Sequence, residues 1–592
     1  MQQLKFSYKA NQIQQLFVEK ILECLYIGTL DSYRLRLHNP KTVIEELVAV
    51  TCQVKENILQ RQEYVAEVSK ETKSLLEKGA KGLIFSSIHL KYYIDDVLTS
   101  KSKDHDALIQ SSKLILKDNL NYAEALVNEI KRQIDQYDGS DISDPNKCNI
   151  IDLNNFKALI EFSLIELANV GYAKQYLYHF LRTVFVHTGG ENMSFDHRYE
   201  LFKELFNKGK SSYIVVFNIL SDQFQFSNLC EIDHSYIQVN KKFRATLPKN
   251  LADQVKKYLE DNKKNKLVGL SIEAHDHYGA VEISRVKISK DLDLYHLGFS
   301  GIKNSIDRQA VVISIEDPSK ASTVPSNYQL EGYTRGNQEV FNILLEKVRK
   351  LHANKVSKES IEKLTSGFRC LRMGSEAAEL ETKLLNFWIG LEFVFTSFKS
   401  DKSTIDRIKT YFPSCHSLIY VRRNLYDFHK AIERMGLSEK IDNYNEDLVY
   451  LAKHKTYTTV ISHSSSILLK QRAREIQLWV ESPSNIAQRL KEHKNNLEWN
   501  ISRLYRIRNE IVHNAALKTN IHSNVSHLKY YLTFILNSML DFLSNFPADI
   551  NNDGEITIED YLISQEIMYG SLKKDSTISD YIKVKNPLEI LH

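Results

Sequence analysis

Apolar residues recur at spacings of three and four over most of this 592-residue chain, and this helical periodicity restricts the fold more than any other feature. It is clearest in three long segments, Thr42–Lys78, Asp106–Ile134 and Leu153–Val186. The whole chain has only 9 prolines and 20 glycines, so few residues interrupt helices. No repeat of fixed length is visible, which argues against a solenoid. We therefore predict a mostly α protein in which residues 1–208 form an N-terminal helical region.

The pattern changes between residues 209 and 335. Four short runs there are rich in β-branched residues and partly alternating, which predicts strands: Ser212–Leu220, Lys266–Ile272, Ala280–Ile288 and Ala310–Ile315. A helical pattern over Leu251–Asn262 separates the first two runs. We expect a small α/β (α+β) module over residues 209–335.

Helical periodicity returns from residue 336 and continues to about residue 546, which predicts a C-terminal helical bundle. Residues 547–592 are expected to form a tail with a turn-rich loop and a short helix. A chain of this length is long enough for about three or four domains.

The charge balance limits how the protein could contact nucleic acid. Lysine and arginine (78) exceed aspartate and glutamate (74) by only four, so any RNA contact must come from local basic patches. The hydrophobic content of 43% and charged content of 26% are typical of globular proteins in solution.

The spacing of the cysteines and the length of the apolar runs indicate in which cellular compartment the protein is found. The six cysteines are far apart and include no C-x-x-C pair, which argues against a zinc cage or a disulfide framework. The first residues, MQQLKFSYKANQ, lack the pattern of a signal peptide. The strongest apolar runs, Leu384–Phe395 and Tyr531–Leu543, are too short to cross a bilayer. We expect a cytoplasmic protein with no membrane contact.

One segment carries a candidate chemistry: residues 501–515, ISRLYRIRNEIVHNA. On a helix, its aliphatic residues Leu504, Ile507 and Ile511 form one apolar face. Tyr505 and Val512 widen that face beyond what a single core contact needs. The extra apolar surface lies beside an arginine and a histidine, and it indicates a self-complementary dimer interface.

The polar residues of this segment suit RNA cleavage. The imidazole of His513 could take a proton from a ribose 2′-hydroxyl near neutral pH. The guanidinium of Arg508 could neutralise the phosphorane that forms when this oxygen attacks the adjacent phosphate. Asn509, four residues before His513, could orient the imidazole through a hydrogen bond. No cofactor is required, and the expected products are a 2′,3′-cyclic phosphate and a 5′-hydroxyl.

Arg508-Asn509-x-x-x-His513 resembles the R-x4–6-H motif of the HEPN superfamily, and LYRIRNEIVH resembles its Apea-like branch in particular. The apolar run that ends in the lone Glu392 looks like an early helix of that branch, and Val525–Phe546 looks like its closing helix. The resemblance covers roughly residues 370–546. It implies a HEPN helical bundle over residues 336–546 that dimerises so that two motifs share one cleft. It also implies roles in RNA-targeting toxins, abortive infection and antiviral (antiphage) defence.

Alternatives accompany each of these predictions. Arg508 and His513 could instead form a helix-surface pair. The R-x4–6-H pattern also occurs at Arg182–His187 and Arg423–His429, where we expect ordinary solvated charges. The neighbouring Arg503 and Arg506 could bind RNA phosphates or form a solvated face. Glu392 could pair with an active-site arginine or with a structural partner.

A second candidate site lies in the tail. Oxygen-bearing side chains fall at positions 1, 3, 5, 7 and 12 of a twelve-residue loop, with glycine at position 6, as in calcium loops: Asp549, Asn551, Asp553, Glu555 and Asp560. The terminal aspartate resembles dockerin-type loops. The alternative is a turn followed by a helix cap, and bound calcium would be structural.

Two further histidines, His275 and His277, are separated by one residue, which a metal site could use. Because two expected strands flank them, we interpret this segment as a hairpin turn.

Together these features predict a cytoplasmic, homodimeric endoribonuclease that acts on RNA. We expect residues 1–335 to sense a trigger or restrain the enzyme, and by analogy the trigger could be derived from a phage. A non-catalytic RNA- or nucleotide-binding adaptor with the same fold is the main alternative, and a helical scaffold without nucleic-acid partners is a third.

Overall fold

The computed structural model describes residues 4–589 except for 29–36, 60, 78–82, 86–87, 100–103, 120, 143–151, 188–192, 221–232, 262–265, 294–304, 328–329, 333–336, 398–399, 515–520, 551 and 553. Helices dominate the described chain, and a five-stranded antiparallel sheet lies between two helical regions of the sequence. The predicted fold class is therefore confirmed. The contacts divide the chain into two compact units, one of residues 1–24, 28–163 and 330–592, the other of residues 25–27 and 164–329.

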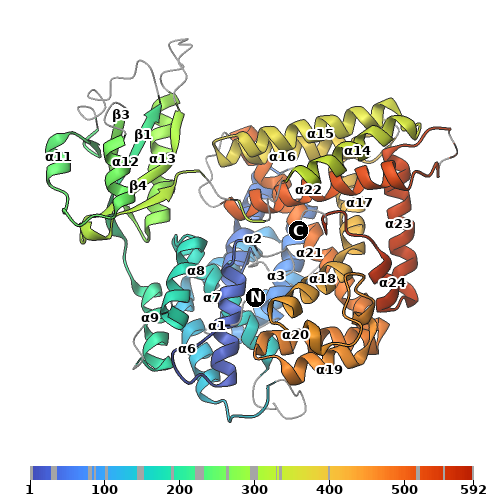
Figure 1. The fold of residues 1–592 in the computed structure, drawn as a ribbon, viewed down its shortest axis with the longest axis horizontal. Helices are drawn as coiled ribbons and strands as arrows, with labels where there is room; N and C mark the ends of the chain where they lie inside the picture. The colour runs from blue at the N-terminus through green and yellow to red at the C-terminus, as the bar shows by residue number, and fades with distance from the viewer. Residues whose placement is uncertain are drawn as a thin grey trace. The chain divides into compact units, whose positions relative to one another are not determined.

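The larger unit combines helices from both ends of the sequence (Figure 1). Its N-terminal helices are α1 (Gln12–Leu25), α2 (Pro40–Lys55), α3 (Glu63–Glu77), α4 (Ile88–Thr99), α5 (His105–Asp118), α6 (Tyr122–Asp135) and the first part of α7 (Leu153–Val170), whose residues from 164 onward belong to the smaller unit. Its C-terminal helices are α14 (Gln338–Ala353), α15 (Lys358–Glu376), α16 (Leu380–Phe395), α17 (Thr404–Leu418), α18 (Tyr420–Arg434), α19 (His454–His463), α20 (Ile467–Glu481), α21 (Pro483–Asn514), α22 (His522–Asn545), α23 (Ile558–Asp575) and α24 (Ile578–Lys583). Two 3-10 turns, Ser438–Lys440 and Val449–Ala452, lie between α18 and α19.

The long helical segments predicted from periodicity each divide into shorter elements. The segment Thr42–Lys78 forms α2 and α3, and the chain turns between them at Asn57, whose φ is 58°. The start of α2 is set by a capping box in which Asn39 and Thr42 accept from each other's backbone, with Pro40 in the first turn. The tail holds two helices, α23 and α24, where one was expected.

Two features show how the larger unit is packed. Gly390 of α16 lies where an added Cβ would come within 2.9 Å of both Cys370 and Leu532, so α15, α16 and α22 approach closely. On another side, α2, α3 and α5 share a core to which Tyr505 of α21 contributes. Helix α21 is therefore enclosed by helices from both ends of the sequence.

The smaller unit contains the sheet. Its helices are α8 (Lys174–Arg182), the π-helix Thr183–His187, α9 (Phe195–Asn207), α11 (Lys241–Ala245), α12 (Asp253–Asp261), α13 (His277–Asp293) and the 3-10 helix Pro318–Lys320. Its strands are β1 (Ser211–Leu220), β2 (Tyr236–Gln238), β3 (Lys266–Ala274), β4 (Ser305–Ser314) and β5 (Ser322–Pro325), in the order β2-β3-β1-β4-β5.

Both faces of this sheet are covered. Val215 is paired with Leu270 of β3 and with Val312 of β4, and this face packs against α13. The adjacent residue, Val216, points to the opposite face and packs against α12. The result is a three-layered module, in agreement with the predicted small central α/β (α+β) module.

The expected strand Ala280–Ile288 is wrong, because these residues lie within α13. The buried residues of α13 include Val281, Arg285, Ile288 and Leu292, which follow helical spacing. Short β-branched runs do not distinguish a strand from a buried helix, and here packing against the sheet decides. The hairpin turn expected at His275 and His277 is wrong for the same reason, since β3 leads into a helix.

Candidate active site

Helix α21 carries the candidate motif in its last two turns. Of the predicted apolar face, Leu504 and Ile511 are buried, whereas Ile507 is only partly buried. Val512 is 48% exposed, so the second apolar stripe is partly open to solvent. The helix is thus buried on more than one side, while the end that carries the motif keeps an accessible surface.

Arg508 is held in a partly exposed position. Its guanidinium donates a hydrogen bond to Asn509 Oδ1 at 3.0 Å and lies 3.8 Å from the carboxylate of Glu392 on α16. About a quarter of each charged side chain is exposed. Of the two alternatives for Glu392, the structure shows the ion pair with the motif arginine. The guanidinium is therefore oriented while solvent still reaches it.

His513 lies in the last turn of α21 and is exposed. It is one turn beyond Asn509, so the two side chains are neighbours on the helix surface. Arg508 and His513 are five residues apart, which at about 100° per residue separates their directions by about 140°. One helix alone therefore does not direct both groups at the same point.

Exposed apolar side chains occur in the same two helices as these polar groups. Ile389 (40% exposed) and Phe393 (47%) lie on α16 on either side of Glu392 in sequence, and Val512 lies between Arg508 and His513 in α21. Glu392 and Arg508 link the two helices. The motif surface is consequently both charged and apolar.

Arg503 and Arg506 do not lie on an accessible surface. Arg503 pairs with Glu46 (2.9 Å) and Glu71 (2.6 Å), and Arg506 pairs with Glu46 and covers the ring of Tyr64. Both arginines are buried, with 6% and 4% of their surface exposed. The predicted RNA contact and the alternative of a solvated face are therefore both wrong. The two guanidiniums are instead paired with carboxylates of the N-terminal helices α2 and α3.

The electrostatics of this cluster favour the ionised form of Glu46. Burial alone would raise the pKa of Glu46, but Arg503, His38 and Arg506 outweigh it and hold that pKa well below the usual value. The imidazole of His38 lies 2.9 Å from the same carboxylate. Glu46 thus ties α2 and the segment before it to α21, and Arg503 extends the network to Glu71 on α3.

Helix α2 also reaches the motif directly. The side-chain amide of Gln53 donates a 2.7 Å hydrogen bond to Glu510, the residue that follows Asn509. The N-terminal helices thus contact α21 at Arg503, Arg506 and Glu510, while Arg508 stays partly exposed and His513 is exposed.

The calcium-like loop is described only in part, since Asn551 and Asp553 lie outside the described residues. Asp549 accepts a hydrogen bond from Gly554 N at 2.9 Å, and Glu555 is exposed. Asp560 is fully buried, accepts from Ile550 N, and forms a capping box with Thr557 at the start of α23. The helix cap is therefore present, and calcium binding stays a prediction.

The histidines of the smaller unit take part in packing. Asp276, between them, is fully buried and accepts from the backbone N–H of Ala173 (2.7 Å), Tyr278 (2.8 Å) and Gly279 (2.9 Å). Burial outweighs these hydrogen bonds and raises its pKa to about 6. Burial lowers the pKa of His277 to about 4. Among the described residues, no three His, Cys, Asp or Glu side chains are grouped closely enough to hold a metal ion.

Sequence reasoning missed a buried polar network beside α21. Arg423 was expected to be a solvated charge, but it is 1% exposed and donates to Tyr530 (2.7 Å), next to His416. His416 in turn contacts His493 of α21 at 2.9 Å. The signal available in the sequence was a high density of histidine and tyrosine in helical segments, which alone does not reveal that they meet.

Comparison with models of protein families, with curated proteins and with solved structures finds no match. None of the described helices is long and apolar enough to cross a bilayer.

Proposed function

We propose that this protein is a metal-independent endoribonuclease of the HEPN type, with Arg508, Asn509 and His513 as its catalytic residues. The observation that carries the proposal is the arrangement of the motif: Arg508 is oriented by Asn509 and Glu392 but remains partly exposed, and His513 is exposed one turn further on. The resemblance of this motif to R-N-x-x-x-H sequences agrees with it.

The reaction follows from the chemistry of these groups. His513 takes the proton of a ribose 2′-hydroxyl, and the 2′-oxygen forms a bond to the adjacent phosphorus. The bond from phosphorus to the 5′-oxygen breaks, and this oxygen leaves as a hydroxyl with a proton from an imidazolium or water. Arg508 offsets the additional negative charge on the phosphorane. The nucleophile comes from the RNA itself, so the reaction consumes no water in this step and requires no metal ion.

A dimer would bring the groups together. Because Arg508 and His513 diverge by about 140° on one helix, two copies of α21 can surround a phosphate better than one. The exposed Ile389, Phe393 and Val512 beside the motif offer apolar surface for such an interface. We propose a homodimer with RNA bound in the cleft between the two motifs.

We also propose a biological setting from the resemblance: a cytoplasmic toxin of antiphage defence, with a trigger that could be derived from the phage. An uncontrolled ribonuclease would damage its own cell. The contacts of Glu46, Glu71 and Gln53 with α21 offer a route by which the N-terminal helices could restrain or align the motif.

One observation favours a second candidate, the non-catalytic RNA- or nucleotide-binding adaptor. The carboxylate of Glu392 lies 3.8 Å from Arg508 and would compete with a phosphate for the guanidinium. An adaptor would bind RNA and leave it intact.

The two functions are separated by incubating the purified full chain with end-labelled total RNA in EDTA. The ribonuclease yields shorter products that end in a 2′,3′-cyclic phosphate. Intact RNA that is nevertheless retained by the protein in a gel shift would support the adaptor and overturn the enzyme.

A further inference from the structure

The smaller unit carries a concentration of positive charge in one short stretch of sequence. Residues 241–260 include six lysines and arginines and two acids, so their net charge is +4, equal to that of the entire chain. The rest of the chain is therefore evenly balanced. Because contact with a polyanion needs a local excess of positive charge, this stretch is where we expect such a contact.

The charges of this stretch lie on the outer side of one layer of the unit. Every fourth residue is apolar and packs into the core on one face of the sheet: Val239, Phe243, Leu247, Leu251, Val255 and Leu259. Helices α11 and α12 and the residues that join them therefore lie along that face (Figure 1). The basic residues between the apolar positions reach solvent, four of them exposed and two half-buried: Lys241, Lys242, Lys249 and Lys257, with Arg244 and Lys256. We call these six residues the basic surface.

Little negative charge offsets the basic surface. Of its six residues, only Lys256 forms an ion pair within the described part of the chain, with Asp253 at 3.9 Å. The buried Arg503, by contrast, is paired with two carboxylates. A phosphate can therefore approach the basic surface without displacing a carboxylate.

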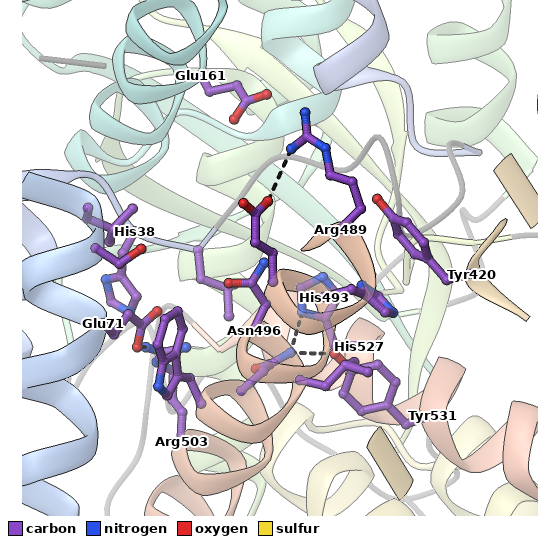
Figure 2. Close-up of a pocket in the computed structure, with 17 residues that line it drawn as sticks. His38, Glu71, Glu161, Tyr420, Arg489, His493, Asn496, Arg503, His527 and Tyr531 are labelled. Atoms are coloured by element: carbon purple, nitrogen blue, oxygen red, sulfur yellow. Dashed lines mark hydrogen bonds and ion pairs between the residues drawn. The ribbon is translucent and has the colours of Figure 1, made fainter. Parts of the chain in front are cut away.

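A polar pocket of about 230 Å³ beside α21 does not provide comparable positive charge. Its two arginines are already paired, Arg503 with Glu71 at 2.6 Å and Arg489 with Glu492 at 3.1 Å. Figure 2 shows Arg503 beside Glu71. The lining also includes Tyr420, His493 and Asn500. A phosphate would have to break an ion pair in this pocket before it gained a partner.

The make-up of the basic surface favours a nucleic-acid backbone over a lipid bilayer. Protein surfaces that bind bilayers combine basic residues with exposed apolar side chains that enter the interface. In this stretch Leu251, Val255 and Leu259 are buried, and Phe243 and Leu247 are half-buried against the same core. Lysines without exposed apolar anchors match the phosphates that repeat along a single strand.

We propose that the basic surface binds RNA through its phosphates. Lysine contacts to phosphates hold and orient a strand but do not read its sequence, so the binding is expected to be independent of sequence. The choice of RNA as the polyanion rests on the proposed function, and the inference adds to that function a surface that holds the substrate. RNA binding and RNA cleavage are nevertheless measured separately.

The test uses the full chain and a fluorescently labelled 2′-O-methyl RNA of mixed sequence. This RNA has no free 2′-hydroxyl, so the proposed chemistry cannot cut it, and failure of cleavage does not affect the result. Fluorescence anisotropy is measured over a series of salt concentrations. Replacing Lys242, Lys249 and Lys257 together by glutamine should weaken binding at least about tenfold. The slope of the logarithm of the affinity against the logarithm of the salt concentration should fall by about 2, because about 0.7 is lost with each phosphate contact to a single strand.

A matched control removes three charges elsewhere in the smaller unit. It carries glutamine at three lysines that are equally exposed and lie outside the basic surface: Lys208, Lys210 and Lys290. Its affinity for the RNA should stay within about twofold of the wild type. Because all six substituted lysines are exposed, both variants should fold as the wild type does.

Three results would overturn the proposal. The first is that the wild type does not bind the RNA, and the second is that the variant of the basic surface binds it as tightly as the control does. The third is that this variant keeps its affinity for RNA but loses binding to vesicles of anionic phospholipid, which would make the basic surface a membrane contact.

Discussion

Arg503 and Glu46 are 457 residues apart in the chain, and their side chains form a buried ion pair at 2.9 Å in the centre of the larger unit. The pair joins α2 to α21, the helix that carries the candidate motif. Arg503, which we expected to contact RNA, therefore stabilises the fold of the larger unit instead. Its replacement should lower the stability of the fold.

Arg503→Ala should lower the free energy of unfolding by about 3–5 kcal/mol, because it leaves Glu46 and Glu71 as buried carboxylates without their main partner. Urea unfolding measures the change. The control is Arg372→Ala, which removes an exposed pair with Glu376 and should cost less than about 1 kcal/mol. Unchanged stability of Arg503→Ala would show that the buried pair does not hold α21.

Glu46 should make the stability sensitive to acid. Its folded-state pKa is held well below 4.5 by Arg503, His38 and Arg506 despite its burial. A depressed carboxyl pKa contributes stability above the unfolded-state pKa, and this contribution is lost as the pH falls below about 4.5 toward the folded-state pKa. The difference in unfolding free energy between the wild type and Glu46→Gln should therefore be largest near neutral pH and narrow between about pH 5 and pH 3. A difference that stays constant over this range would contradict the assignment.

Asp276 should be essential for the fold of the smaller unit. Its carboxylate accepts three backbone N–H groups at the starts of α8 and α13, and Asp276→Ala would leave them without it. We expect a loss of about 2–4 kcal/mol in unfolding free energy, compared with about 1 kcal/mol for Ser194→Ala at the single cap of α9. Asp276→Asn keeps one oxygen and should fall between the two. If Asp276→Ala and Ser194→Ala lower the unfolding free energy by the same amount, Asp276 stabilises the fold no more than an ordinary helix cap does, and the prediction is wrong.

The sequence predicted some of this structure well and some poorly, and the reasons differ. The helices and the strands β1, β3 and β4 follow from periodicity, because the face that each buries repeats along the chain. Ala280–Ile288 has the composition of a strand, and only the packing of α13 on the sheet reveals the helix. The local sequence pattern predicts an element correctly where the element buries one face along its whole length. It does not do so where tertiary contacts decide between a helix and a strand.

The candidate site shows the same limit. The spacing of Arg508, Asn509 and His513 could be read directly, and Glu392 was recognised as an acid isolated in an apolar helix. The partners of Arg503 and Arg506 could not be predicted, since Glu46 and Glu71 lie more than 400 residues earlier and nothing local links them. Asn500, His493 and Tyr420 likewise meet only in the folded chain.

Arg508→Ala and His513→Ala should each lower the rate of RNA cleavage by at least about 100-fold, because one removes the charge that offsets the phosphorane and the other removes the general base. Arg508 is partly exposed and His513 is exposed, so the unfolding free energy should change by less than about 1 kcal/mol. Cleavage rates on labelled RNA and urea unfolding test the two halves of the prediction. Lys491→Ala, on an exposed part of the same helix, is the control and should cleave normally.

The most direct test of the proposed chemistry is a pair of oligoribonucleotides that differ at the mapped cleavage position, one with its 2′-hydroxyl and one with a 2′-deoxy substitution there. In EDTA, the first should be cut to a 2′,3′-cyclic phosphate and a 5′-hydroxyl, and the second should remain intact at that linkage. Equal cleavage of both, loss of cleavage in EDTA, or no cleavage of either would contradict attack by the 2′-oxygen under the control of His513 and Arg508.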